Sequence, residues 1–371
     1  MHLTQKIISK PADLLAQIPT LAAIKPDLLV VFGSVAHFSA PDFADTLHAG
    51  LPGAALIGCT TAGEISADGV NDNTCTLTAI KLDKTTLTRA STTLTGMDDS
   101  FAAGERLGQQ LAATDLKAVL VFGPGVLING SALVDGITSI IGSNTPITGG
   151  LAGDGGAFKQ TFTLGPDGVR DNAIVAIGLC GESLAFGHGS FGGWEPFGPA
   201  RKVTRCTNNV LFELDDEPAL DVYKRYLGEH AKGLPASGLL FPFAMLGEDH
   251  NAIGLIRTIL GIDEASGSLT LAGEIDPNGY LKLMHASTDK LVNAPKQQPK
   301  RPRQCSTTQE KVWRFWSVVS AANWSWATGW TKKSRQLAMS WATRRFSPVF
   351  IPTAKSAHSP LAPRANYTIR L

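Results

Sequence analysis

The chain of 371 residues lacks the features of a membrane-inserted or exported protein. No apolar run reaches the roughly 18 residues that are needed to span a bilayer. The N-terminal stretch MHLTQKIISKPADLL has no apolar core of the kind that a secretory signal requires. We therefore expect a cytoplasmic protein without membrane insertion.

Cysteine is scarce, and its spacing is irregular. The five residues are Cys59, Cys75, Cys180, Cys206 and Cys305. Because no two of them are closely paired, the pattern excludes a disulfide framework and a cysteine-rich zinc site. We expect reduced thiols, no bound metal and no cofactor.

Acidic side chains are almost missing from the last part of the chain. Residues 296–371 contain 14 Lys and Arg but one acid, Glu310, which gives a net charge of +13. Residues 1–295 contain 19 basic and 31 acidic side chains, a net charge of −12. A nucleic-acid-binding surface needs clustered Lys and Arg, so the acidic part does not favour one. We expect the function to reside in residues 1–295.

The acidic part contains an internal repeat. Two apolar strand patterns recur at an offset of 90 residues, each followed by a helix candidate, and a third strand pattern recurs at an offset of 99. The matched runs are LVVFGS (29–34) with VLVFGP (119–124), ALIGCTTAGE (55–64) with TPITGGLAGD (145–154), and DNTCTLTAI (72–80) with DNAIVAIGL (171–179). The sequence therefore predicts an α/β fold of duplicated β-α-β-β units that form mixed sheets. A smaller, incomplete α/β domain should follow.

Five runs, in this order, resemble the FIST family: VVFGS, IGCTTAGEI, GWEPFGP, PALDVYKRYLG and IRTILGIDEASGSLTLAGEI. The resemblance implies a N-terminal FIST domain over residues 28–215, after a lead-in over 1–27, and a partial C-terminal FIST domain over 216–293. It also implies a sensory module that binds a small ligand, such as an amino acid or a small carboxylate. No output domain is visible, so the expected partner is a separate signalling protein.

The basic, Trp-rich tail at 294–371 departs from the resemblance. The C-terminal FIST domain usually continues with another strand and a glycine-containing turn, where this chain has TKKSRQLAMSWATRRF. One hypothesis is a frameshift between Asn293 and Trp313, either real or a sequencing error. The alternative is a natural basic tail. The nucleotide sequence distinguishes them, because a frameshift predicts a family-like ending in another frame.

Small residues at two strand ends form the candidate ligand site. Such turns leave peptide N–H groups uncovered for an anion, and ligands of open α/β sheets lie beyond the carboxyl ends of the strands. The two turns should converge, with an acid in each for the ammonium group of a zwitterion. The candidate residues are Thr60, Thr61, Gly63 and Glu64 in the first turn, and Gly149, Gly150 and Asp154 in the second.

Each candidate also has a structural interpretation. The glycines could supply close backbone approach, and Glu64 and Asp154 could accept only backbone N–H groups. Two further candidates lie later in the chain. Trp194 could stack on a ligand or fill a core, and Arg257 could bind a carboxylate or lie on a solvated strand face.

An enzyme is the alternative class. Cys59 stands at a strand end, where a nucleophile is often placed, and would support hydrolase or transferase chemistry if a histidine lay close to it. The histidines are scattered along the chain, and a buried inert thiol is the alternative for Cys59. We therefore assign no catalytic residue and do not expect an enzyme.

Overall fold

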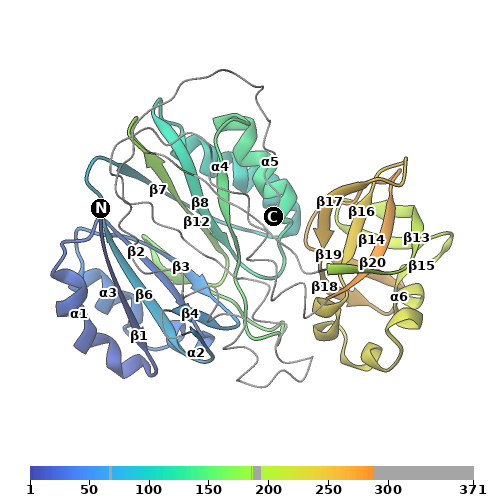
Figure 1. The fold of residues 1–371 in the computed structure, drawn as a ribbon, viewed down its shortest axis with the longest axis horizontal. Helices are drawn as coiled ribbons and strands as arrows, with labels where there is room; N and C mark the ends of the chain where they lie inside the picture. The colour runs from blue at the N-terminus through green and yellow to red at the C-terminus, as the bar shows by residue number, and fades with distance from the viewer. Residues whose placement is uncertain (67–68, 185, 187–193, 287–371) are drawn as a thin grey trace, which may run out of the picture.

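The fold is a mixed α/β arrangement in a computed structural model that describes residues 1–66, 69–184, 186 and 194–286 (Figure 1). The predicted α/β class is confirmed. The tail at 294–371, with the frameshift hypothesis, lies outside the described residues. Among the described helices, none is long and apolar enough to cross a membrane.

The first repeat forms a six-stranded sheet in the order β1-β6-β2-β3-β10-β11, of which the last two strands come from later in the chain. Strands β2 and β3 are parallel, and β6 runs antiparallel to β2. The strands are β1 (His2–Ile8), β2 (Leu28–Gly33), β3 (Ala55–Thr60), β6 (Cys75–Lys81), β10 (Thr163–Gly165) and β11 (Gly168–Arg170). The helices are η1 (Pro11–Asp13), α1 (Leu14–Ala22), α2 (Val35–Phe38) and α3 (Phe43–Gly50), and a hairpin of β4 (Glu64–Ser66) and β5 (Gly69–Asn71) follows β3.

The second repeat forms a four-stranded sheet in the order β7-β12-β8-β9. Its strands are β7 (Thr86–Thr93), β8 (Leu116–Gly123), β9 (Ile147–Leu151) and β12 (Ala173–Cys180). Its helices are η2 (Met97–Asp99), α4 (Ser100–Leu111) and α5 (Gly130–Ile141). The strand order β1-β6-β2-β3 of the first sheet is repeated here as β7-β12-β8-β9, which confirms the predicted duplication.

Strand register shows where the predicted offsets hold. Val31 lies opposite Leu77, and Val121 lies opposite Ala176, as the offsets of 90 and 99 require. At the second parallel strand the predicted offset of 90 is wrong by one residue. Val31 pairs with Gly58 but Val121 pairs with Gly149, an offset of 91, because the second repeat has one more residue between its parallel strands.

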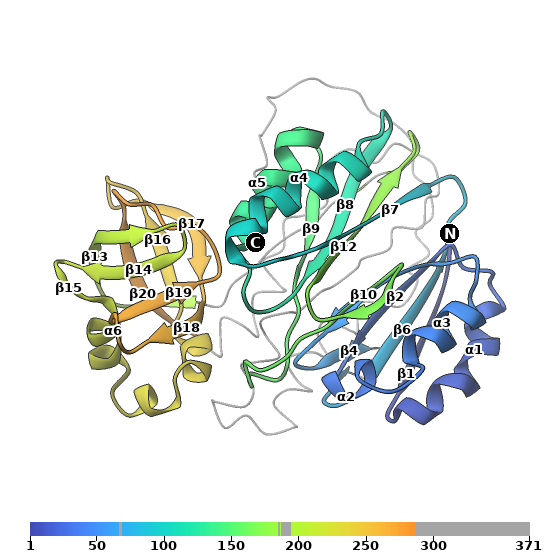
Figure 2. The same cartoon turned by 180° about the vertical axis from the view of Figure 1, so that it is seen from behind.

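The repeats pack sheet against sheet, with helices on both outer faces (Figure 2). Along β2, alternate residues face opposite sides, so Val31 packs toward the helices and Val30 toward the other sheet. The equivalent residues Phe32 and Phe122 meet between the sheets, edge to face, with ring centroids 5.3 Å apart. A continuous apolar layer therefore joins the two repeats.

A third sheet forms the C-terminal unit, here residues 194–286. Its order is β17-β16-β20-β13-β14-β19-β18, with β15 on β14. The strands are β13 (Trp194–Thr207), β14 (Val210–Leu214), β15 (Glu217–Pro218), β16 (Phe243–Leu246), β17 (Ala252–Arg257), β18 (Ile259–Asp263), β19 (Ser268–Leu271) and β20 (Tyr280–Ala286). The helices are α6 (Ala219–Leu227), η3 (Gly228–Gly233) and η4 (Ala236–Leu240). Helix α6 buries an apolar stripe against this sheet, made of Leu220, Tyr223 and Leu227.

Candidate functional site

The first predicted turn begins inside a sheet, because β10 lies beside the end of β3. The backbone N–H of Thr60 donates to the carbonyl oxygen of Phe162 at 2.9 Å. The N–H of Phe162 donates to the Oγ1 of Thr60 at 3.0 Å. Thr60 is 1% exposed, so both its polar groups are already used inside the protein.

Glu64 holds this turn closed. Its carboxylate accepts from the Thr61 hydroxyl at 2.7 Å and from the Thr74 hydroxyl and N–H at 2.7 and 3.1 Å. Glu64 is 1% exposed, and burial raises the pKa of its carboxyl, although these hydrogen bonds oppose the rise. The acceptor that we expected to face a ligand ammonium instead ties both ends of the β4–β5 hairpin together.

Asp154 plays a similar part in the second turn. Its carboxylate accepts from three consecutive backbone N–H groups, those of Phe158, Lys159 and Gln160, at 3.1, 2.7 and 3.3 Å. These bonds close the loop at 154–160. The expectation that each turn carries an acid therefore holds, but each acid accepts hydrogen bonds from its own turn.

The two turns do meet. The N–H of Gly153 donates to the carbonyl oxygen of Thr60 at 2.8 Å. A Cβ at Gly149 would collide with the carbonyl oxygen of Val121, and a Cβ at Gly58 would collide with that of Val31. Both glycines thus permit close approach of two parallel strands, which supports the structural interpretation for Gly149. The neighbouring Gly150 pairs with Phe122 in the same ladder, and Gly63 precedes β4.

The structure does not bring Trp194 and Arg257 to these turns. Trp194 begins β13 opposite Ala286, in the C-terminal unit. The interpretation of Arg257 as a solvated strand residue is wrong, because its side chain is 6% exposed. Its Nε donates to the carbonyl oxygen of Glu274 at 2.8 Å, and its Nη2 donates to the Ser131 hydroxyl at 3.2 Å.

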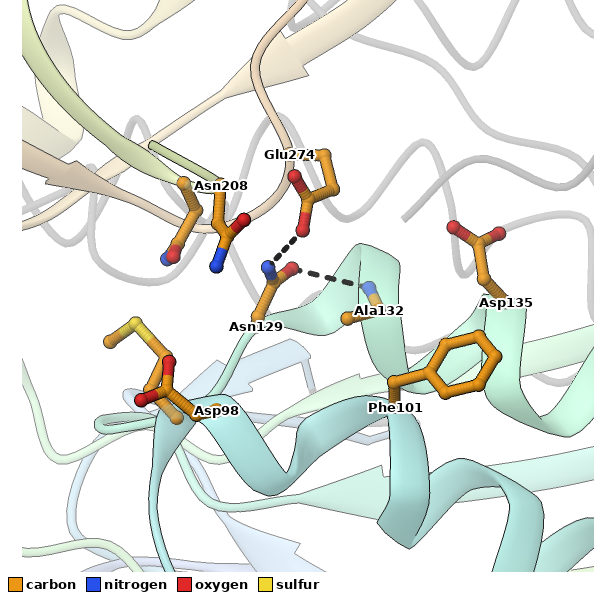
Figure 3. A pocket seen from close by; sticks show the side chains of 9 residues that line it. Asp98, Phe101, Asn129, Ala132, Asp135, Asn208 and Glu274 are labelled. Atoms are coloured by element: carbon orange, nitrogen blue, oxygen red, sulfur yellow. Dashed lines mark hydrogen bonds between the residues drawn. The ribbon is translucent and has the colours of Figure 1, made fainter. Parts of the chain in front are cut away.

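Arg257 marks the contact between the second repeat and the C-terminal unit, and a cavity of about 280 Å³ lies beside it (Figure 3). We call this the interface cavity. Its walls come from the starts of α4 and α5 on one side and from two loops of the C-terminal unit on the other. The lining residues are Met97, Asp98, Phe101, Asn129, Ala132, Asp135, Asn208, Asn209 and Glu274.

Asn129 is the central side chain of the interface cavity. Its Oδ1 caps α5 by accepting from the N–H of Ala132 at 3.2 Å, as an N-cap residue does. Its Nδ2 donates to the Glu274 carboxylate at 2.6 Å, across the boundary between the two parts. The N–H of Gly130 also crosses the boundary and donates to the carbonyl oxygen of Ala272 at 3.2 Å. Figure 3 shows Asn129 between Glu274 and the first turn of α5.

The electrostatics of the interface cavity are negative. Three lining residues carry carboxylates, Asp98, Asp135 and Glu274, and none of the lining residues is basic. The adjacent Arg257 is buried, which lowers the pKa of its guanidinium, while the charges of Glu274 and Asp135 oppose that change. The carboxylates of Glu274 and Asp135 therefore already stabilise one cation at this wall, the guanidinium of Arg257.

None of the residues that line this cavity was predicted as a site residue, although the adjacent Arg257 was. Asn129 lies just before the helix candidate that follows VLVFGP, and Glu274 lies in the run IRTILGIDEASGSLTLAGEI that resembles the FIST family. No local signal indicated that the two side chains bond, because they are 145 residues apart. Asn209 is 2% exposed and bonded to the carbonyl oxygen of Leu271, and nothing in the sequence set it apart.

Cys59 is not placed to act as a nucleophile. It is fully buried between the sheets, and burial raises the pKa of its thiol far above the usual range. The four described cysteines are all free thiols. Among the described residues, no group of three or more His, Cys, Asp or Glu side chains is arranged to hold a metal ion.

Comparisons with known proteins agree with the resemblance. A family model of the FIST N domain matches residues 27–217, and a family model of the FIST C domain matches residues 219–319. A protein of Methanocaldococcus jannaschii, described only as uncharacterized, is 35% identical over 91 residues. This segment covers 24% of the present chain and 17% of the relative, so the chain spans less than a fifth of that protein.

Proposed function

Because the chain belongs to the FIST family, whose domains are associated with sensory roles in signal transduction, we propose that it binds a small polar ligand and signals through a separate protein. The ligand is an amino acid or a small carboxylate. The free thiols of the described cysteines suit a reducing compartment, and the cytoplasm is the proposed location.

One observation carries this proposal: the interface cavity lies where the parts matched by the two family models meet. Asp98, Asn129 and Asp135 precede residue 217, whereas Glu274 belongs to the FIST C match. A ligand shifts an equilibrium only by its different affinity for the two states. A ligand in the interface cavity contacts both the FIST N and the FIST C matches. If the two move relative to each other, its contacts change, and its affinity for the two arrangements then differs.

The boundary itself suits a change in arrangement. The described hydrogen bonds that cross it have Asn129, Gly130 and Arg257 as donors, and they join the start of α5 to the loop at 272–274 and to the end of β17. Polar interfaces between domains permit relative motion more readily than large apolar ones. By contrast, a continuous apolar core joins the two repeats to each other.

The turn residues stay a second proposed position for the ligand. Thr60 and Gly153 are hydrogen-bonded, so the two turns lie side by side as a shared site requires. Because Glu64 and Asp154 already accept internal hydrogen bonds, a ligand at the turns would have to replace those bonds. In the interface cavity, Glu274 accepts from Asn129, but the carboxylates of Asp98 and Asp135 accept no hydrogen bond from the described residues, and we favour this cavity.

A thermal-shift screen of the full chain across amino acids and small carboxylates tests the proposal. Ligand that binds only the folded state stabilises it by RT ln(1 + [L]/Kd), which is about 2.7 kcal/mol at a hundredfold excess over Kd. A compound should raise the Tm of the unaltered protein, and Glu274→Gln should reduce that rise if the interface cavity is the site.

The turn variant Thr61→Ala serves as the matched comparison. If it abolishes the rise while Glu274→Gln does not, the ligand lies at the turns and the cavity assignment is wrong. A screen in which no compound of either class raises the Tm contradicts the sensory proposal itself.

A further inference from the structure

We propose that the outer edge of strand β9 is the docking surface for the separate signalling protein, which adds an extended segment to the second sheet. The added segment runs antiparallel to β9 and carries apolar side chains at alternate positions. This inference goes beyond the proposed function, from which it takes only the existence of a separate partner. It does not depend on the small ligand, because no residue of β9 lines the interface cavity.

Strand β9 lies at one edge of the second sheet in the described part of the chain (Figure 2). The N–H of Ala152, just after β9, donates to the carbonyl oxygen of Gly123 in β8 at 2.8 Å. In a parallel pair, every second residue directs its backbone groups to the neighbouring strand, so those of Gly149 and Leu151 point away from β8. Within the described residues, neither of these two N–H groups donates to an acceptor. An edge of this kind is a template for another strand.

The equivalent edge of the first repeat is covered. Strand β10 lies antiparallel on β3, on the side away from β2. The N–H of Thr60 donates there to the carbonyl oxygen of Phe162 at 2.9 Å. Leu151 is the equivalent of Thr60 at the offset of 91, since it pairs with β8 as Thr60 pairs with β2. The molecule therefore contains two related edges, one with an added strand and one without.

The length of one connection explains the difference between the edges. Hairpin β4–β5 of the first repeat corresponds to hairpin β10–β11 of the second, at the offset of 99 that relates β6 to β12. Eleven residues join β9 to β10 and carry this hairpin across to β3, whereas three residues join β3 to β4. The carboxylate of Glu64 also accepts from the Thr74 hydroxyl at 2.7 Å, which keeps β4 beside its own repeat. Hairpin β4–β5 therefore does not cover β9.

The strand that lies on β3 shows which side chains such an edge accepts. Leu164 lies opposite Gly58 and is fully buried in the core beneath the helices of the first repeat. Because Gly58 has no side chain, this face of β3 leaves room for the leucine. Phe162 packs against the same core, and the small Thr163 between them faces the other side. The edge favours two apolar side chains separated by one small residue.

Strand β9 offers a matching surface. Gly149 repeats the glycine of β3, so β9 likewise presents no side chain at this position. Val134 of α5 corresponds to Ala44 of α3 at the offset of 90, and Ala44 lies beside Gly168 of β11. Val134 and Leu151 are only half-buried in the core of the second repeat, so an added strand would remove their apolar surface from water. Backbone hydrogen bonds would supply affinity and the apolar side chains specificity.

Peptide binding to the full chain tests this edge. The probe is the fluorescein-labelled peptide QTFTLGP, which repeats residues 160–166 and includes β10. It should bind saturably in an anisotropy titration, and QTSTSGP, with both apolar side chains replaced by serine, should bind about tenfold more weakly or worse. The chain's own β10 is tethered at high effective concentration, so the peptide does not displace it from β3. No binding of QTFTLGP, or equal binding of the two peptides, overturns the proposal.

A pair of variants tests the location. Leu151→Pro removes the N–H that points away from β8, and proline is tolerated at such positions of edge strands. Leu151→Ala is the matched control, because it also shortens the side chain but keeps the N–H. The proline variant should bind QTFTLGP about fivefold more weakly than the alanine variant, the size expected for one hydrogen bond. Equal affinities of two variants with native circular dichroism would place the peptide elsewhere and overturn the site.

Hydrogen exchange of the unaltered full chain gives a measurement that needs no variant. Without peptide, the N–H of Leu151 should exchange much faster than that of Thr60. Added QTFTLGP should slow exchange at Gly149 and Leu151, but not at Thr148, whose N–H points toward β8. If Leu151 is as protected as Thr60 in the protein without peptide, another part of this chain or a second copy already covers the edge. That result would make the proposal wrong.

The docking proposal and the proposed function fail separately. If QTFTLGP binds as expected but no amino acid or small carboxylate raises the Tm, the docking edge stands and the proposed ligand class is wrong. If such a compound raises the Tm, but QTFTLGP neither binds nor slows exchange at Leu151, the ligand proposal stands and β9 is not the docking surface.

Discussion

The turn region, where β3 and β9 end, and the interface cavity both contain acidic side chains, but these side chains have different surroundings. In the turn region, Glu64 and Asp154 are surrounded by donors from their own loops. In the interface cavity, Asp98 and Asp135 are exposed, and within the described part of the chain neither carboxylate accepts a hydrogen bond. The acids of the turns therefore stabilise their own loops. The two exposed acids between the second repeat and the C-terminal unit have carboxylates that a ligand can reach.

This comparison leads to a general expectation for variants. Changes in the turn region should alter the free energy of unfolding with little effect on ligand affinity beyond the loss of folded protein. Changes in the interface cavity should alter affinity with a smaller effect on unfolding. The expected effects below run from the largest to the smallest.

Gly149→Ala should have the largest effect on stability. The added Cβ would collide with the carbonyl oxygen of Val121, which belongs to the neighbouring strand and cannot rotate away. We expect a loss of about 3 kcal/mol, as for an overpacked core site, measured by urea unfolding. Gly53→Ala is the control, because a Cβ there meets no atom within 4 Å. Equal stabilities of the two variants would show that the strands are not held this closely.

Glu64→Ala should cost about 2 kcal/mol, because it leaves the buried N–H of Thr74 without an acceptor. Glu64→Gln should be much milder, since its amide oxygen can accept from Thr74 and its amide nitrogen can donate to the Thr61 hydroxyl. Urea unfolding of the two variants at one pH gives the comparison. If Gln is as damaging as Ala, the turn requires the charge rather than the hydrogen bonds.

Asn129→Ala should cost about 1 kcal/mol through loss of the α5 cap. It also removes the donor to Glu274, so hydrogen exchange at the start of α5 and at residues 272–274 should rise together. Asn129→Asp is the matched variant, because it keeps a capping oxygen but places a second carboxylate beside Glu274. Unchanged exchange at 272–274 in both variants would contradict a link across the boundary.

The pH dependence from Glu64 should be the smallest effect. Burial raises the pKa of this carboxyl above the ordinary value of 4.5, so the folded state binds a proton more tightly than the unfolded state. Its stabilising contribution is complete below the ordinary value and is lost as pH rises through the raised pKa. The difference in unfolding free energy between the unaltered protein and Glu64→Gln should therefore shift against the unaltered protein as the pH rises from 4.5. A shift in the opposite direction would mean that the hydrogen bonds outweigh burial.

Much of the fold could be predicted because its strands have continuous apolar patterns. Strands β2 and β8 are buried on both faces, and their likeness in sequence revealed the duplication. The edge strands β1 and β7 escaped notice because their sequences HLTQKII and TLTRASTT contain many polar residues and lack a continuous apolar run. The structure adds these strands, with α1 and α4, to the start of each repeat.

The candidate site was harder to predict. The turn pair was chosen correctly as a place where two repeats meet, since equivalent strand ends lie together in related units. The exposed carboxylates of Asp98 and Asp135, however, lie in the interface cavity, between the second repeat and the C-terminal unit. Arg257 illustrates the difficulty: its place in an alternating strand suggested a solvated face, but α5 and the loop at 272–274 cover it.

The sequence by itself determined the central strands of each repeat, the duplication and the membership of the FIST family, because these depend on local patterns of apolar and turn residues. Only the tertiary structure decided which carboxylates accept hydrogen bonds inside the protein and which are exposed. Glu64 finds Thr74 ten residues away, while Glu274 finds Asn129 at a separation of 145. Partners for a buried polar group are selected by proximity in space, which the packing of sheets and helices creates and the local sequence does not contain.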